Sequence, residues 1–144
     1  MRAVYRIWAT LLFILVIVQV GLAGYGAFYA ANKLDDEGST IDEDVFMDGF
    51  GLHVGLGYLV ILAGLVFLVI GVVAGIGRWR LGRHGVLFGL LILQVVLAWI
   101  GFSEPAIGVL HPVNALLIFG LLGWICSNEW RLSRADPTSS AAPV

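Results

Sequence analysis

Hydrophobic residues form four long runs along the chain, and polar residues gather between the runs. The runs cover residues 5–29, 49–76, 85–102 and 107–126. Each run predicts a membrane-spanning helix, since about 20 helical residues cross a hydrocarbon core of about 30 Å. Single strands are excluded because they leave backbone groups unsatisfied in lipid. We therefore expect an all-α fold, a bundle of four transmembrane helices within residues 1–135.

Charged residues between the runs predict how the bundle is oriented. Arginines lie before the first run, between the second and third, and after the fourth: Arg2, Arg6, Arg78, Arg80, Arg83, Arg131 and Arg134. The other two connections are acidic, with Asp35, Asp36, Glu37, Asp42, Glu43, Asp44, Asp48 and Glu104. Basic residues concentrate on the cytoplasmic side of membrane proteins, so both termini are expected in the cytoplasm. His84 directly follows Arg83, and we expect its side chain to face water and lipid headgroups.

The composition agrees with a membrane protein and excludes several classes of function. Hydrophobic residues make up 60% of the 144 residues and charged residues only 12%, unlike a soluble domain. The lipid bilayer is the expected environment, and a net charge of −2 without a basic groove argues against nucleic acid as a partner. The single cysteine, Cys126, excludes thiol–disulfide chemistry that needs a cysteine pair. Residues 136–144 are small and polar and predict a flexible tail.

A weak repeat relates the two halves of the sequence. Residues 18–28 align with residues 93–102, with Gln19 opposite Gln94, and Leu52-His53 aligns with Leu110-His111. The first and third runs cross the membrane in the same direction, as do the second and fourth. We therefore expect a pseudo-twofold tandem (2+2) repeat with its axis along the membrane normal. In such a bundle the second and fourth helices face one another, which places His53 opposite His111.

The matched histidines are the sharpest chemical signal in the sequence. Counting about 1.5 Å per residue from the flanking arginines puts both near the outer interface at similar height. Neutral imidazole is a suitable iron ligand, and a haem takes axial ligands from its two faces. Each ring also needs an acceptor for its other N–H. Pro112 lacks an N–H, so the free carbonyl of Gly108 is a candidate acceptor for His111.

Two glycines and two glutamines complete the candidate site. Gly49 and Gly57 lie four residues either side of His53 on one helical face, which makes room for a flat porphyrin. The same spacing also occurs where membrane helices simply pack closely. The depth count puts Gln19 and Gln94 nearer the midplane, where polar side chains must face the bundle interior. There they either bond each other or the backbone, or border a haem edge or a quinone pocket.

These features together resemble a known family. Histidines open the second and fourth helices, and Gln-Val-x-Leu-Ala recurs on the first and third, as in one four-helix half of a heme A synthase. The stretch His111-Pro-Val-Asn-Ala also resembles small prokaryotic four-helix membrane proteins. The resemblance implies that His53 and His111 are the axial ligands of a haem b. It also implies a multi-pass protein of a prokaryotic plasma membrane.

The sequence departs from that family at one place. In heme A synthases the reactive half carries a glutamate shortly before its first histidine, implicated in oxidising the haem methyl group. Here Gly49 and Phe50 stand at the corresponding distance before His53. The chain therefore resembles the half that only holds a haem b, and we do not expect it to modify haem by itself.

Three functions agree with these residues. The leading hypothesis is a b-type cytochrome with bis-histidine ligation, which transfers electrons or holds haem for a redox partner and is not an enzyme by itself. The second is a haem-free accessory or assembly subunit of a larger membrane complex. The third is a membrane protein that binds a quinone or another small molecule through Gln19 and Gln94.

Overall fold

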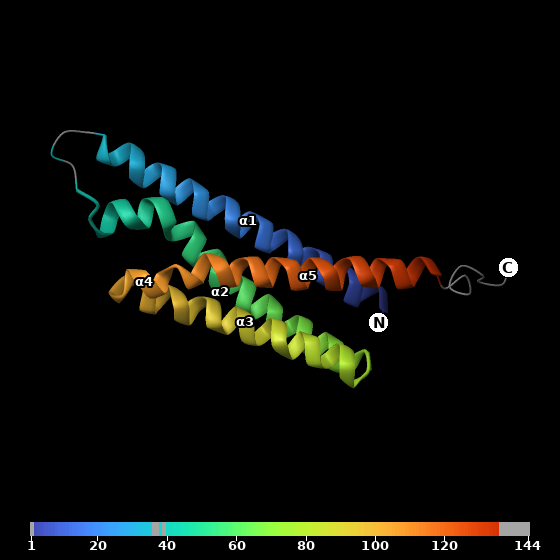
Figure 1. Ribbon diagram of the computed structural model, residues 1–144. Coiled ribbons are helices and arrows are strands. Elements are labelled where there is room, and N and C mark those ends of the chain that lie inside the picture. Colours follow the sequence, from blue (N-terminus) through green and yellow to red (C-terminus); the bar gives the residue numbers. More distant parts are fainter. Residues whose placement is uncertain (1, 36–37, 39, 136–144) are drawn as a thin grey trace.

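The computed structural model describes residues 2–35, 38 and 40–135. These residues form helices and no strand, in the order α1 (Arg2–Leu34), α2 (Glu43–Val73), α3 (Arg78–Ser103), α4 (Pro105–Gly108) and α5 (Leu110–Ala135) (Figure 1). The four long helices are each long and apolar enough to cross a membrane. The all-α prediction with four membrane spans is thus confirmed. The expected tail, residues 136–144, lies outside the described residues, as do Asp36 and Glu37.

The helices extend beyond the apolar runs because their polar end turns are helical too. α2 begins at Glu43, well before residue 49, where the apolar run begins. The Asp42 carboxylate caps this helix by accepting a hydrogen bond from the Val45 backbone N–H at 2.9 Å. Glu43 and Asp44 then lie in the first turn, where acidic side chains interact favourably with the helix dipole. The fourth run is interrupted, since the single turn α4 precedes α5.

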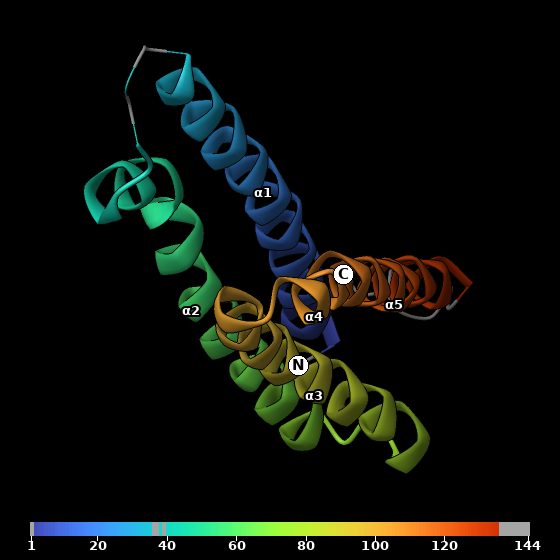
Figure 2. The same cartoon turned by 60° about the vertical axis from the view of Figure 1, so that its left-hand side comes forward.

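The long helices form a ring in which α2 and α5 lie on one diagonal. α1 packs beside α2 and α5, and α3 packs beside α2 and α5 on the other side. Figures 1 and 2 show that the outer ends of α1 and α2 point away from α4 and the start of α5. The start of α1 and the end of α5 lie at the same end of the bundle.

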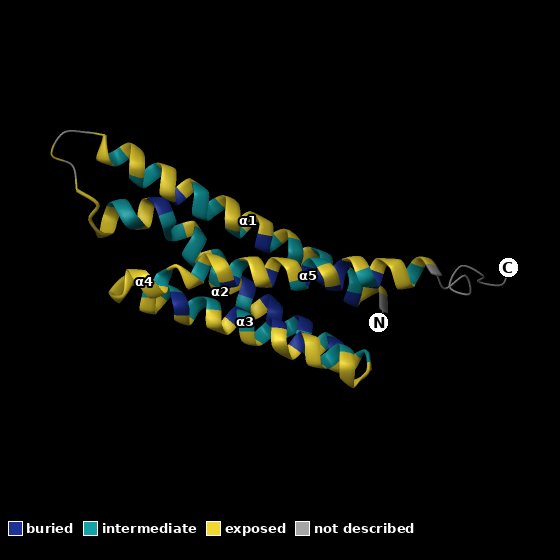
Figure 3. Ribbon diagram, viewed as in Figure 1, coloured by how far each residue is buried: buried dark blue, intermediate teal, exposed yellow. Residues whose placement is uncertain are grey.

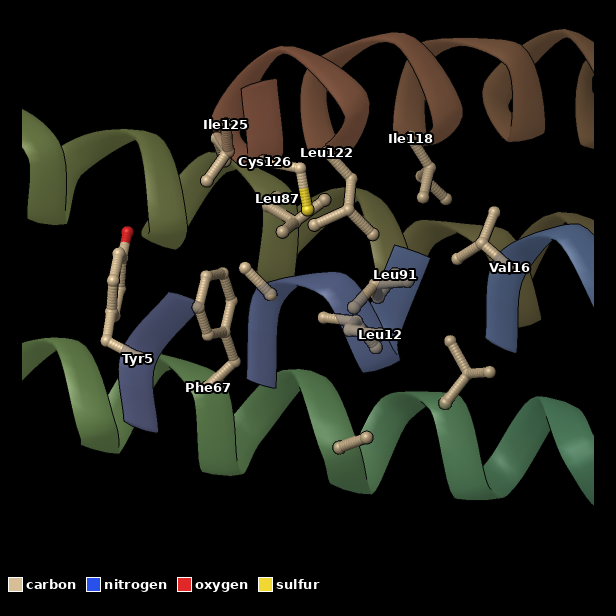
Figure 4. Close-up of a cluster of buried hydrophobic side chains, with 13 residues drawn as sticks. Tyr5, Leu12, Val16, Phe67, Leu87, Leu91, Ile118, Leu122, Ile125 and Cys126 are labelled. Carbon is tan, nitrogen blue, oxygen red and sulfur yellow. The ribbon is translucent and has the colours of Figure 1, made fainter. Parts of the chain in front are cut away.

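The hydrophobic core occupies the half of the bundle that contains these two chain ends. Its buried side chains include Tyr5, Leu12 and Val16 from α1, Phe67 from α2, Leu87 and Leu91 from α3, and Ile118 and Leu122 from α5 (Figure 4). Along the four helices the core stops at Val16, Val60, Leu91 and Ile118. Beyond that level the bundle has few buried residues (Figure 3).

Candidate functional site

His53 and His111 lie across the diagonal of the bundle and face each other. His53 comes from α2 and His111 from the first turn of α5. The centres of their imidazole rings are 6.3 Å apart, and the ring planes meet at 64°. Both side chains are partly buried. The two histidines that the sequence pairs are therefore neighbours in space.

The same hydrogen bond orients both rings. Nδ1 of His53 donates to the backbone carbonyl of Gln19 at 3.1 Å, and Nδ1 of His111 donates to that of Gln94 at 2.9 Å. A carbonyl oxygen only accepts, so Nδ1 carries the proton in each ring. In a neutral imidazole Nε2 then keeps its lone pair, which is the electron pair that binds a metal.

The acceptor for His111 differs from the one expected from the sequence. Gln94 on α3 supplies the carbonyl, and the expectation of Gly108 is wrong. Gly108 belongs to the separate turn α4, which ends before α5 begins at Leu110. Gly108 is therefore not part of the helix that carries His111. The sequence signal for the true acceptor is the alignment of Gln19 with Gln94 in the two halves.

The amide side chains of the same layer join helices to one another. Gln19 donates from Nε2 to the backbone carbonyl of His53 at 2.6 Å. Asn114 donates from Nδ2 to Gln94 Oε1 at 2.7 Å and to the Leu90 carbonyl at 2.9 Å, and it is only 3% exposed. Both glutamines therefore face the bundle interior, where these bonds offset the cost of polar groups in lipid.

Histidines and glutamines form one layer, and the separate depths expected from the sequence are wrong. The expected depths assumed that all arginines lie at one height. Tyr5 and Phe67 stack with ring centres 5.1 Å apart, and α2 continues beyond Phe67 to Val73 before Arg78 follows. Counted from this stacked pair, Gln19 and His53 are both about four helical turns away. Arg78 thus lies farther than Arg6 from the histidine layer. A count that starts at Arg78 therefore overestimates how far His53 lies from the arginine-rich surface.

Gly49 and Gly57 lie against α1. A Cβ atom on Gly49 would come within 3.3 Å of the Gly26 carbonyl oxygen, and one on Gly57 within 3.2 Å of Gln19 Nε2. Gly49 therefore allows α1 and α2 to approach closely, which is the packing role that this spacing often has. Gly57 leaves the room in which the Gln19 side chain reaches the His53 carbonyl.

Aromatic rings lie beside the histidine pair on the side toward the start of α2. The Phe50 ring meets the His53 ring edge-on with centres 6.3 Å apart, and Phe46 stacks on Phe50 at 5.1 Å. Phe102 at the end of α3 touches the edge of Phe46 at 5.5 Å. This cluster of Phe46, Phe50 and Phe102 joins α2 to α3 above the site.

Few side chains are buried around the layer. The core ends at Val16 and Leu91, one turn before Gln19 and Gln94, and at Val60 and Ile118, two turns from His53 and His111, all on the arginine-rich side of the layer. From the histidines outward, the buried positions among the described residues are Gly26, Gly49 and Leu97. The helices thus contribute almost no buried side-chain core on this side of the layer.

His84 lies in the core, and the expectation that it faces water is wrong. It is 2% exposed, its Nδ1 donates to the Arg80 carbonyl at 2.7 Å, and its Nε2 accepts from the Tyr5 hydroxyl at 2.6 Å. Arg80 also forms an ion pair with the buried Glu129 of α5. The signal was present in the sequence, because His84 shares a helical face with Leu87 and Leu91. Both ring nitrogens have protein partners, so His84 has no free nitrogen for a metal.

The described residues contain no cluster of three or more histidine, cysteine, aspartate or glutamate side chains that would hold a bare metal ion. No family model, curated protein or solved structure matches the chain.

Proposed function

We propose that the chain is a membrane-bound b-type cytochrome in which His53 and His111 hold a haem. The separation of the two rings carries this proposal. A metal–imidazole bond is about 2 Å long and the nitrogen lies about 1 Å from its ring centre, so two rings on one iron have centres roughly 6 Å apart. The ring centres of His53 and His111 are 6.3 Å apart.

Three further features support the proposal. Both imidazoles are fixed as the tautomer whose Nε2 binds a metal, through bonds to two backbone carbonyls. The region outward of the layer has almost no core of its own, as a site for a large flat group requires. The faces of the Phe46, Phe50 and Phe102 cluster provide apolar covering.

A haem bound in this way supplies one-electron oxidation and reduction. Two protein ligands leave no open position for oxygen chemistry, which favours electron transfer or haem holding over catalysis. The role of the chain would be to orient both imidazoles through the carbonyls of Gln19 and Gln94. The electrons would then pass to or from a membrane redox partner or a larger complex.

The orientation and the ancestry of the chain belong to the same proposal. The arginines at one end of the bundle favour cytoplasmic termini, and on this proposal the haem lies on the side of the core that faces away from the cytoplasm in a prokaryotic plasma membrane. The equivalent bonds of His53 with Gln19 and of His111 with Gln94 support a tandem repeat. They also favour the likeness to the haem b-holding half of a heme A synthase. Phe50 and Gly49 stand where the reactive half has its glutamate, so haem oxidation is not part of the proposal.

The deciding experiment is an absorption spectrum of the protein purified from cells supplied with haem. We expect a red protein with a reducible low-spin spectrum. The variants His53→Ala and His111→Ala should lose that spectrum or convert it to high spin, because one axial ligand is missing. His84→Ala is the matched control and should keep it, since both nitrogens of His84 have other partners.

Other results would favour the other functions. A protein that stays colourless after haem supplementation would favour the accessory-subunit hypothesis. A colourless protein that carries a quinone, and loses it on Gln19→Leu or Gln94→Leu, would favour the quinone-binding hypothesis. Unchanged low-spin haem in the His53→Ala/His111→Ala double variant would overturn the ligand assignment.

A further inference from the structure

The two histidines are held differently, although the sequence pairs them. His111 and Asn114 follow one another by one turn on α5, and together they make three hydrogen bonds to α3, at Gln94 O, Gln94 Oε1 and Leu90 O. His53 shares two hydrogen bonds with Gln19 on α1. The position in α2 that corresponds to Asn114 is Leu56, which has no side-chain hydrogen-bonding group.

The helix that carries His53 also differs in composition from the one that carries His111. Gly49, Gly51, Gly55 and Gly57 flank His53 on α2, and each glycine lowers the intrinsic stability of a helix. The outer parts of α1 and α2 also diverge from α4 and the start of α5 (Figures 1 and 2).

We infer that His111 is the fixed axial ligand, that Asn114 is the positioning residue that fixes it, and that His53 is the ligand that exchanges. This inference rests on the proposed haem binding. Asn114 acts through Gln94: its amide holds the glutamine side chain of the residue whose carbonyl orients the His111 ring. A small neutral ligand such as carbon monoxide would therefore take the place of His53. In that exchange the bond from His53 Nε2 to the iron would break and carbon monoxide would bind in its place, with His53 still hydrogen-bonded to the Gln19 carbonyl.

The first test compares the two single-histidine variants. His53→Ala should retain haem through His111 and, once reduced, bind carbon monoxide at least roughly tenfold more tightly than the unaltered protein, because no internal ligand competes. His111→Ala should retain haem at least roughly tenfold less well than His53→Ala, a difference of about 1.4 kcal/mol. Equal haem retention and equal carbon monoxide binding in the two variants would overturn the inference.

The second test isolates Asn114. In the His53→Ala background, Asn114→Leu should lower haem retention by roughly tenfold, about 1.4 kcal/mol. In the His111→Ala background the same change should have little effect, because no imidazole remains for Asn114 to position. A merely structural role would weaken both backgrounds alike and would count against the inference. Leu56→Asn, the equivalent position beside His53, is the matched control and should leave haem retention in the His53→Ala background unchanged.

These outcomes separate the inference from the proposed function. If the unaltered protein binds no haem, the proposed function fails. If the unaltered protein shows the low-spin spectrum but the two single-histidine variants retain haem equally well, the haem assignment stands. Only the inference that the two ligands are unequal is then refuted.

Discussion

Polar side chains inside the apolar interior are paired by hydrogen bonds with their neighbours. Tyr5, His84 and Arg80 form a chain of hydrogen bonds at the arginine-rich end, from the Tyr5 hydroxyl to His84 and on to the Arg80 carbonyl. The rings of Tyr5 and Phe67 stack, and Phe67 also packs on His84 with ring centres 4.5 Å apart. This cluster ties α1, α2 and α3 together and so stabilises the fold.

Tyr5→Phe should therefore destabilise the fold without changing the histidine layer. The substitution keeps the ring and removes the hydroxyl, which leaves Nε2 of the buried His84 without a donor. Such a loss costs about 1–3 kcal/mol. Unfolding in detergent, followed by circular dichroism, measures it. Tyr58→Phe at an exposed position is the control and should change stability by no more than about 0.5 kcal/mol. Equal stability of the two variants would show that the Tyr5–His84 bond contributes nothing.

The sequence predicts which histidines and glutamines pair, but it does not predict their carbonyl acceptors or the burial of His84. Gln19 with Gln94 and His53 with His111 stand out because a repeat places each pair in register. Asn114 is one turn from His111, so its place on a similar face follows from the helical period. The carbonyl acceptors could not be read, because every residue has a carbonyl and only the packing of neighbouring helices selects one. His84 was misplaced because its neighbour Arg83 outweighed the apolar face that it shares with Leu87 and Leu91.

Between elements, the crossing of α1 and α2 depends on small residues. Gly26 on α1 is buried, and a Cβ atom there would lie 2.6 Å from the Phe50 ring of α2. Phe50 is itself held by Phe46, with ring centres 5.1 Å apart, and cannot swing aside freely. Four apolar runs predict four helices, but they do not predict how near two helices come, since that depends on which faces meet.

Gly26→Ala should accordingly destabilise the bundle by about 1–3 kcal/mol, the usual cost of overpacking a tight contact. Gly24→Ala, two residues earlier on the same helix, is the control. Nothing lies within 4 Å of a Cβ atom at Gly24, so the change should be neutral or stabilise the helix by at most about 1 kcal/mol. Detergent unfolding compares the two variants.

A second variant identifies the colliding side chain. In a Phe50→Ala background the cost of Gly26→Ala should shrink, because the ring that the new methyl group meets is gone. An unchanged cost would place the clash elsewhere along α1. The size of this coupling between the two positions measures how tightly α1 and α2 are joined beside His53.

The whole molecule divides into a packed end and a thinly packed end, and its charges divide in the same way. Arg80, Arg83, the start of α1 and the end of α5 lie at the packed end, with Arg83 stacked over Trp124 at 4.5 Å. Asp42, Glu43, Asp44 and Asp48 lie at the other end, beside the start of α2. The histidine layer falls between the packed core and this acidic end.

The charge division predicts which side of the membrane each end faces. In a background of Cys126→Ala, a membrane-impermeant maleimide should label Thr40→Cys on intact cells, because the exposed Thr40 lies at the acidic end. Trp79→Cys, at a residue that is 85% exposed at the arginine-rich end, should be labelled only after the cells are opened. The protein with its natural Cys126 is the control and should stay unlabelled on both sides, because Cys126 is buried in the core. The reverse pattern would place the histidine layer nearer the cytoplasm, and the redox partner would then have to be sought on that side.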